Sequence, residues 1–127
     1  LLDGAHNPQG AHALRAYLDE HFPGAKLTLV TGMMADKQIE DCAHELAPAF
    51  SRVIATRVEE ARAASPERVA SAYAAEGCCV ATARSVREAL QMADGICVVA
   101  GSLYLVGAAR ALLKGETEWN FATSRCS

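Results

Sequence analysis

The sequence predicts an α/β fold, with a mostly parallel, Rossmann-like sheet between two layers of helices. Helical and strand-like patterns alternate about five times along the 127 residues, as they do in chains that build a parallel sheet. The strand-like runs are short and apolar and lack a polar face, which is typical of strands covered on both sides. A chain of this length is also sufficient for one buried core.

The N-terminal half contains the first of these patterns. Leu1-Leu2 is the end of a strand, and residues 8–21 form an amphipathic helix with Leu14, Tyr17 and Leu18 on its apolar face. The pattern next predicts a strand over residues 26–31. The following helix, capped by Asp36, is expected to run to Pro48.

The C-terminal half repeats the alternation three more times. Serine precedes the apolar pattern at two helix starts, where its hydroxyl suits the cap position. A continuous apolar run, residues 96–100, is the last strand. The expected strands are 52–58, 78–82 and 96–100, and the helices are 65–77, 85–93 and 101 to about 114.

These patterns group residues 1–114 into one domain. A strand of two residues is improbably short, so we expect the domain to be truncated at its N-terminus and to follow a missing upstream part. Residues 115–127 show no periodicity, which predicts a loosely ordered tail.

Charge and composition exclude several classes of protein. With 12 basic and 15 acidic residues, the net charge of −3 gives no electrostatic reason to bind nucleic acid or an anionic membrane. No apolar run approaches the ~20 residues of a membrane span, and the N-terminus is no signal peptide. We therefore expect a cytoplasmic protein.

The cysteines indicate neither a disulfide framework nor a metal site. Their number is odd and no Cys-x-x-Cys pair occurs, which favours reduced thiols. His44 follows Cys42 by two residues, but no further ligand cluster accompanies them. The five are Cys42, Cys78, Cys79, Cys97 and Cys126.

The opening segment, Asp3 to Pro8, carries the first candidate site. Asn7 is a good helix N-cap and Pro8 suits the first helical position, so Asp3 and His6 lie at a strand's carboxyl end, where open α/β sheets bind ligands. The carboxylate of Asp3 can accept hydrogen bonds from sugar hydroxyls, although Asp-Gly is equally a turn. His6 precedes a helix start that favours anions, or it only fills the turn.

Other candidates follow the later strands and reach the same edge of the sheet. Ser102 lies at a strand-to-helix junction, where its hydroxyl and nearby amides can grip a carboxylate or simply cap the helix. Gly101 permits close backbone approach. Asp36-Lys37 is explained by a helix start with a solvated lysine, and Arg62 is an exposed loop arginine.

Four motifs follow one another along the chain: Asp3 to Pro8, Gly32 to Lys37, Arg62 to Ala64 and Gly101 to Gly107. In this order they resemble the C-terminal domain of the bacterial folylpolyglutamate synthase/dihydrofolate synthase family, a branch of the Mur ligase superfamily. The resemblance covers nearly the whole chain, to about residue 114. Gln38 departs from the pattern, because the family often has a second aspartate there.

This resemblance implies a Mur ligase C-terminal domain fold and assigns roles to individual residues. It implies that Asp3 contacts the nucleotide near its ribose and that His6 and Ser102 hold glutamate. It places no catalytic residue and no metal ligand in this chain. Further residues expected to line the site are Asn7, Asp36, Lys37, Arg62 and Gly101.

The resemblance also implies a reaction: ATP-dependent addition of L-glutamate to dihydropteroate or folates through an acyl phosphate. The chain lacks the G-x-x-x-x-G-K-[ST] phosphate loop. By the family's pattern, that loop, the Mg²⁺ ligands and the folate pocket belong to an N-terminal ATPase domain of the same polypeptide. We therefore expect the chain alone to be inactive.

Three other interpretations remain open. A Mur-type or other amino-acid ligase is the nearest. A serine hydrolase would use Ser102 as nucleophile, His6 as base and Asp3 or Asp36 to orient the histidine, but the residues around the serine lack the G-x-S-x-G elbow. The third is a nucleotide-binding module without catalysis.

Overall fold

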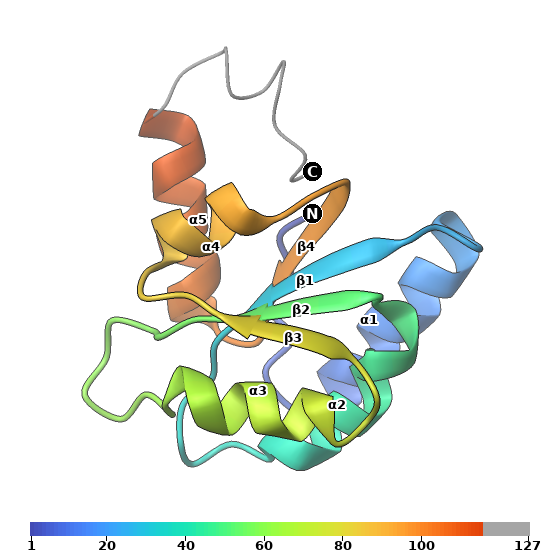
Figure 1. Cartoon of the computed structure of the whole chain (residues 1–127), viewed down its shortest axis with the longest axis horizontal. Helices are drawn as coiled ribbons and strands as arrows, with labels where there is room; N and C mark the ends of the chain where they lie inside the picture. The colour runs from blue at the N-terminus through green and yellow to red at the C-terminus, as the bar shows by residue number, and fades with distance from the viewer. Residues whose placement is uncertain (116–127) are drawn as a thin grey trace.

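A computed structural model describes residues 1–115 and contains the predicted parallel sheet (Figure 1). Its strand order is β3-β2-β1-β4, and every pair of neighbours is parallel. This confirms the predicted α/β class. The strands are β1 (Leu27–Thr31), β2 (Arg52–Ala55), β3 (Cys79–Thr82) and β4 (Ile96–Ala100).

The predicted strand end at Leu1-Leu2 lies beside β4. Leu2 forms an isolated parallel bridge with Val99. The Val99 amide donates to the Leu1 carbonyl over 2.8 Å, and the Asp3 amide donates to the Val99 carbonyl over 2.9 Å. The opening residues therefore lie as a short extra strand segment on the outer side of β4. Asp3 then lies at the carboxyl edge of the sheet.

Helices cover both faces of the sheet and complete the expected three layers (Figure 1). One face carries α1 (Pro8–His21), α2 (Ile39–Leu46) and α3 (Pro66–Ala74). The other carries α4 (Val86–Met92) and α5 (Leu103–Gly115). A short 3₁₀ turn, Ala47–Ala49, follows α2.

The core has two halves because successive strand residues point to opposite faces. Leu29 packs with the first helix layer, whereas its neighbour Val30 packs with the second. On β2 the same alternation sends Val53 to the first half and Ile54 to the second. All four are fully buried, which explains why the sequence of these strands shows no polar face.

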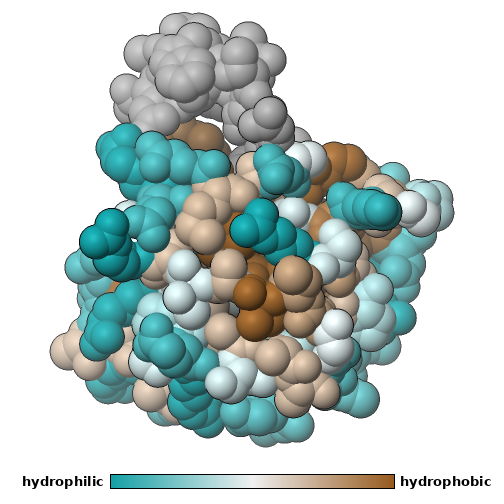
Figure 2. Space-filling view, viewed as in Figure 1, coloured by the Kyte–Doolittle hydropathy of each residue, from teal (hydrophilic) through white to brown (hydrophobic). Residues whose placement is uncertain are grey.

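The outer strand β3 differs, because it has a neighbour on one side only. Cys79 and Thr82 are exposed there, and the two residues between them are half-buried. Figure 2 shows hydrophobic residues gathered over this strand.

Three predicted helix caps are confirmed. The side chains of Asn7, Ser65 and Ser85 each accept a backbone N–H from the first turn of the helix that follows. The predicted cap at Asp36 is wrong: α2 begins three residues later, after Gln38, which makes no side-chain cap bond. The loop bends back toward the segment after β2 instead, so Asp36 pairs with another loop.

The predicted strand 52–58 ends earlier, at Ala55. The Thr56 amide still donates to the Thr31 carbonyl over 2.8 Å, but β1 stops there, and β2 then lacks a neighbour on that side. The predicted tail lies outside the described residues, apart from Gly115, which ends α5. Within residues 1–115, no helix is long and apolar enough to cross a membrane.

Candidate functional site

The strand order creates a switch point between β1 and β4. From β1 the chain steps outward to β2 and β3, and it then returns to the other side of β1 as β4. In open α/β sheets, ligands bind at the carboxyl ends of strands where the order reverses in this way. Gly32 follows β1 at this point, and Gly101 follows β4.

Both glycines are required by the close approach of backbone segments. Gly101 has a φ of +122°, and a Cβ there would lie 2.5 Å from Thr31 Oγ1 and 2.8 Å from the Gly32 carbonyl oxygen. A Cβ on Gly32 would lie 2.6 Å from the carbonyl oxygen of Thr56. The close approach expected at Gly101 is therefore to the chain itself.

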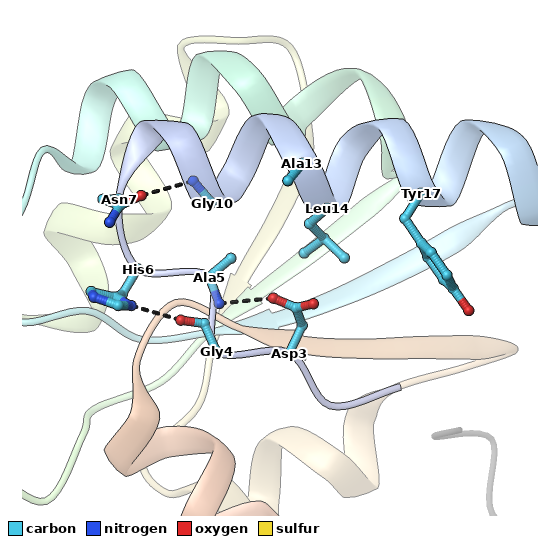
Figure 3. Close-up of a pocket in the computed structure, with 9 residues that line it drawn as sticks. All are labelled: Asp3, Gly4, Ala5, His6, Asn7, Gly10, Ala13, Leu14 and Tyr17. Carbon is cyan, nitrogen blue, oxygen red and sulfur yellow. Dashed lines mark hydrogen bonds between the residues drawn. The ribbon is translucent and has the colours of Figure 1, made fainter.

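Asp3 and His6 lie in the turn that leads into α1, and each bonds to its own segment (Figure 3). Asp3 Oδ1 accepts the Ala5 amide over 2.8 Å, and His6 Nδ1 lies 2.7 Å from the Gly4 carbonyl oxygen. Since a carbonyl only accepts, Nδ1 carries the proton. Asp3 Oδ2 and His6 Nε2 have no hydrogen-bond partner among the residues described.

A pocket of about 350 Å³ lies between this turn and α1. Figure 3 shows the Asp3 carboxylate and the Tyr17 ring on the same side of α1. Tyr17 was expected on the apolar face of the helix, but it is 43% exposed. Its ring stacks on His21 with centroids 4.0 Å apart. The lining is Asp3, Gly4, Ala5, His6, Asn7, Gly10, Ala13, Leu14 and Tyr17.

Ser102 caps α5. It is buried, its Oγ accepts the Tyr104 amide over 3.1 Å, and its carbonyl accepts the Val106 amide over 3.0 Å. The structure thus confirms the helix-cap interpretation. A hydroxyl that accepts one bond still has its own proton to donate, so the cap does not prevent Ser102 from binding a ligand.

The turn containing Asp3 and His6 touches the start of α5, almost a hundred residues away. A Cβ on Gly4 would lie 2.7 Å from Leu103 Cδ2. Gly4 also supplies the carbonyl that His6 bonds, and Leu103 directly follows Ser102. The structure therefore brings the two predicted glutamate-binding segments into contact.

The remaining candidates form a second group. Arg62 lies 3.7 Å from Asp36, in an exposed ion pair of a kind that contributes little to stability. The main chain joins the two loops, since Met34 bridges Ala63 and the Ala35 amide donates to the Arg62 carbonyl over 2.7 Å. In the part of the chain that is described, no hydrogen bond or ion pair links this group to the first.

A second pocket, of about 510 Å³, connects the starts of α1 and α2. Asn7 and Gln38, the two cap residues, both line it, and Lys37 lies next to Gln38. This pocket was not expected from the sequence, because the helix was predicted to be capped by Asp36 and not to begin after Gln38. Its lining is Asn7, Pro8, Gln9, Gln38, Asp41, His44 and Glu45.

The site contains neither an assembled triad nor a metal cluster. Among the described residues, no hydrogen bond joins Ser102 to His6, or His6 to Asp3 or Asp36; Ser102, His6 and Asp3 bond to their own segments. No three His, Cys, Asp or Glu side chains of residues 1–115 come together in a way that could hold a metal ion.

Comparison with known proteins identifies the fold. The family described as "Mur ligase, glutamate ligase domain" matches residues 1–110. The chain belongs to this family. This match confirms the resemblance to a Mur ligase C-terminal domain that the four sequence motifs indicated.

Folylpolyglutamate synthase of Lacticaseibacillus casei is 36% identical to this Mur ligase domain over 122 residues, 91% of the chain and 27% of that protein. The folylpolyglutamate synthase structure from Thermotoga maritima matches with a TM-score of 0.83 and 36% identity, covering 91% of this chain and 27% of that one. Folylpolyglutamate synthase of Mycobacterium tuberculosis, complexed with ADP, matches with a TM-score of 0.81 and 31% identity, and the match covers 87% of this chain and 28% of that one. The domain is homologous to these ligases and spans about a quarter of their length.

Proposed function

We propose that this domain is the C-terminal part of an ATP-dependent ligase that adds L-glutamate to dihydropteroate or to folates. Family membership and the names of the relatives support the reaction class. The observation that carries the proposal is the contact between the Asp3–Asn7 turn and the start of α5, because it unites the residues needed to hold an amino acid beside a nucleotide.

The proposed reaction has two steps. The γ-phosphoryl group of ATP first moves to the carboxylate of the acceptor, which releases ADP and forms an acyl phosphate. The α-amine of glutamate then attacks the acyl carbon. A C–N bond forms, the bond from carbon to the phosphate oxygen breaks with its electron pair, and the amine loses a proton as inorganic phosphate leaves.

His6 and Ser102 are assigned to glutamate. His6 Nδ1–H is directed to Gly4, so the ring orientation is set before a ligand arrives. The neutral ring then offers the Nε2 lone pair to the amine, whereas the protonated ring would donate Nε2–H to a carboxylate. The Ser102 hydroxyl proton, together with the amides at the start of α5, suits a carboxylate of the same amino acid.

Asp3 is assigned to the nucleotide. Its Oδ1 is used by the Ala5 amide, which leaves Oδ2 for a ribose hydroxyl. Asn7 and Gly101 shape this part of the site, while Asp36, Lys37 and Arg62 are proposed to line its other rim.

The phosphoryl chemistry is assigned to an N-terminal ATPase domain of the same polypeptide. Residues 1–115 include no candidate metal cluster, so we place the ligands of the Mg²⁺ that accompanies ATP in that domain. We propose that it also holds most of the folate pocket. We propose a cytoplasmic location, because the free cysteines among the described residues suit a reducing compartment.

Steady-state kinetics of the full-length protein test these assignments. His6→Ala and Ser102→Ala should each raise the KM for glutamate about 10- to 100-fold, since each removes a hydrogen bond to a charged group worth about 1.5–3 kcal/mol. The KM for ATP should change less than about twofold. Matched controls are His12→Ala and Ser71→Ala, both exposed and outside the site.

The outcome separates the candidate functions. Equal effects on the KM values for glutamate and ATP would show that the roles are misassigned. Transfer of glutamate to a peptidoglycan precursor, and to no pteroate or folate, would favour a Mur-type ligase. Covalent labelling of Ser102 by a fluorophosphonate would favour the hydrolase.

A further inference from the structure

The first turn of α5 presents large hydrophobic side chains to solvent. Leu103 is 66% exposed and Tyr104 is 57% exposed, whereas Leu105 and Ala109 on the inner face of the helix are fully buried. The burial of α5 against the sheet therefore does not depend on Leu103. Single exposed leucines are common on protein surfaces. Exposure alone therefore does not indicate a function for Leu103, and its position must be considered.

Leu103 lies between the two segments assigned to glutamate. It directly follows Ser102 in the chain, and its Cδ2 would be 2.7 Å from a Cβ on Gly4. No atom of Tyr104 lies within 4 Å of that Cβ position. Leu103 thus covers the backbone of the turn that orients His6, and most of its side chain faces outward.

The chemistry of the acceptor indicates what this surface meets. In a pteroate, the carboxyl carbon that the amine attacks is bonded directly to an aromatic ring. When His6 and Ser102 hold glutamate with its amine in position for attack, the ring must lie beside the same two segments. Leu103 is the exposed apolar side chain that joins them.

We propose that the Leu103 side chain forms an apolar wall for the aryl ring of an aromatic carboxylate acceptor. This inference rests on the proposed glutamate ligase function. Contact with the ring removes apolar surface from water on both partners. It also helps to hold the acyl carbon at the distance and angle that attack requires.

Acceptors that differ in ring position give a direct test. In dihydropteroate the ring is bonded to the reacting carboxyl group, whereas in a folate monoglutamate the reacting γ-carboxyl group is separated from the ring by a glutamyl residue. Leu103→Ser in the full-length protein should lower kcat/KM for dihydropteroate about tenfold, the scale of a lost apolar contact. It should change kcat/KM for the folate, and the KM values for glutamate and ATP, less than about twofold.

Two further variants separate this role from a structural one. Leu103→Met should restore the use of dihydropteroate to within about twofold, because methionine keeps the apolar volume. Tyr104→Ser, on the same helical turn but away from Gly4, should leave the selectivity between acceptors unchanged. The thermal unfolding midpoint of Leu103→Ser should match that of the wild type, since its side chain is mostly exposed.

Several results would overturn the inference while leaving the ligase function intact. These are an equal loss with both acceptors, a rise in the KM for glutamate or ATP, or a wild type that extends folates but does not use dihydropteroate. By contrast, absence of ATP-dependent glutamate addition to either acceptor would refute the proposed function itself.

Discussion

Replacement of Gly101 by alanine tests the packing that underlies the site. The residue has a φ of +122°, and an alanine Cβ would lie 2.5 Å from Thr31 Oγ1 and 2.8 Å from the Gly32 carbonyl oxygen. Backbone strain at such a position costs about 1–3 kcal/mol, and forced overlap in a packed region costs about 1–3 kcal/mol more. Alanine also reduces the conformational entropy of the unfolded chain, which offsets about 0.4–1 kcal/mol of this loss. We expect the free energy of unfolding to fall by about 3 kcal/mol.

Gly24→Ala is the matched control. Gly24 also has a positive φ, of +72°, but a Cβ there would meet nothing within 4 Å. It should therefore lower the free energy of unfolding by about 1 kcal/mol, the cost of left-handed backbone alone. Urea unfolding followed by circular dichroism measures both values, and an unchanged m-value shows that the comparison is valid.

The free energies of unfolding of Gly101→Ala and Gly24→Ala should differ by about 2 kcal/mol. Most of this difference reflects the close contact at the switch point. Equal losses, within about 0.5 kcal/mol, would show that β1 and β4 do not approach as the structure indicates. Because Gly101 precedes Ser102, the full-length Gly101→Ala protein should also show a raised KM for glutamate, whereas Gly24→Ala should not.

Three further predictions concern the core, a cap and a titration. Ile54→Ala should lower the free energy of unfolding by about 2–5 kcal/mol, because it leaves a cavity at a fully buried position of strand β2. Ser65→Ala should lower it by about 0.5–2 kcal/mol through loss of the α3 cap, whereas the exposed Ser71→Ala should have little effect in the same urea titration. Burial raises the pKa of Cys42 to about 11 from 9.0, so the thiol ionises more readily in the unfolded chain. Stability should therefore decline as the pH rises from about 9 to about 11, and Cys42→Ala should make that decline shallower.

The fold could be predicted from the sequence because its signals are local. Short apolar runs such as residues 96–100 and caps such as Ser65 and Ser85 define elements without reference to distant residues. The predictions of individual elements were wrong where a residue distant in the sequence determines the local structure. Asp36 pairs with Arg62 rather than capping α2, and β2 ends when its neighbour ends rather than where its apolar residues end.

The site could be predicted only in part, for the same reason. A candidate at each strand end follows from the parallel sheet, but strand order decides which ends are neighbours. The sequence did not establish that Leu2 lies beside β4, and so could not bring Gly4 and Leu103 into contact. Helical periodicity likewise predicted Tyr17 on the apolar face of α1. It could not reveal that part of this face borders a pocket, which leaves Tyr17 exposed.

The alignment of the two halves of the site depends on β4. Val99 exchanges hydrogen bonds with Leu1 and Asp3 on one side and pairs with Val30 on the other. Two residues further along the chain, Gly101 directs it into the α5 start. The distance between the Asp3–Asn7 turn and Ser102 is therefore set within one buried strand rather than by flexible loops. A shift of one residue in the pairing of Leu2 would move Asp3 and His6 relative to Ser102 and reverse the faces of their segment. We conclude that the register of β4 is as important to the geometry of the proposed glutamate site as the side chains themselves.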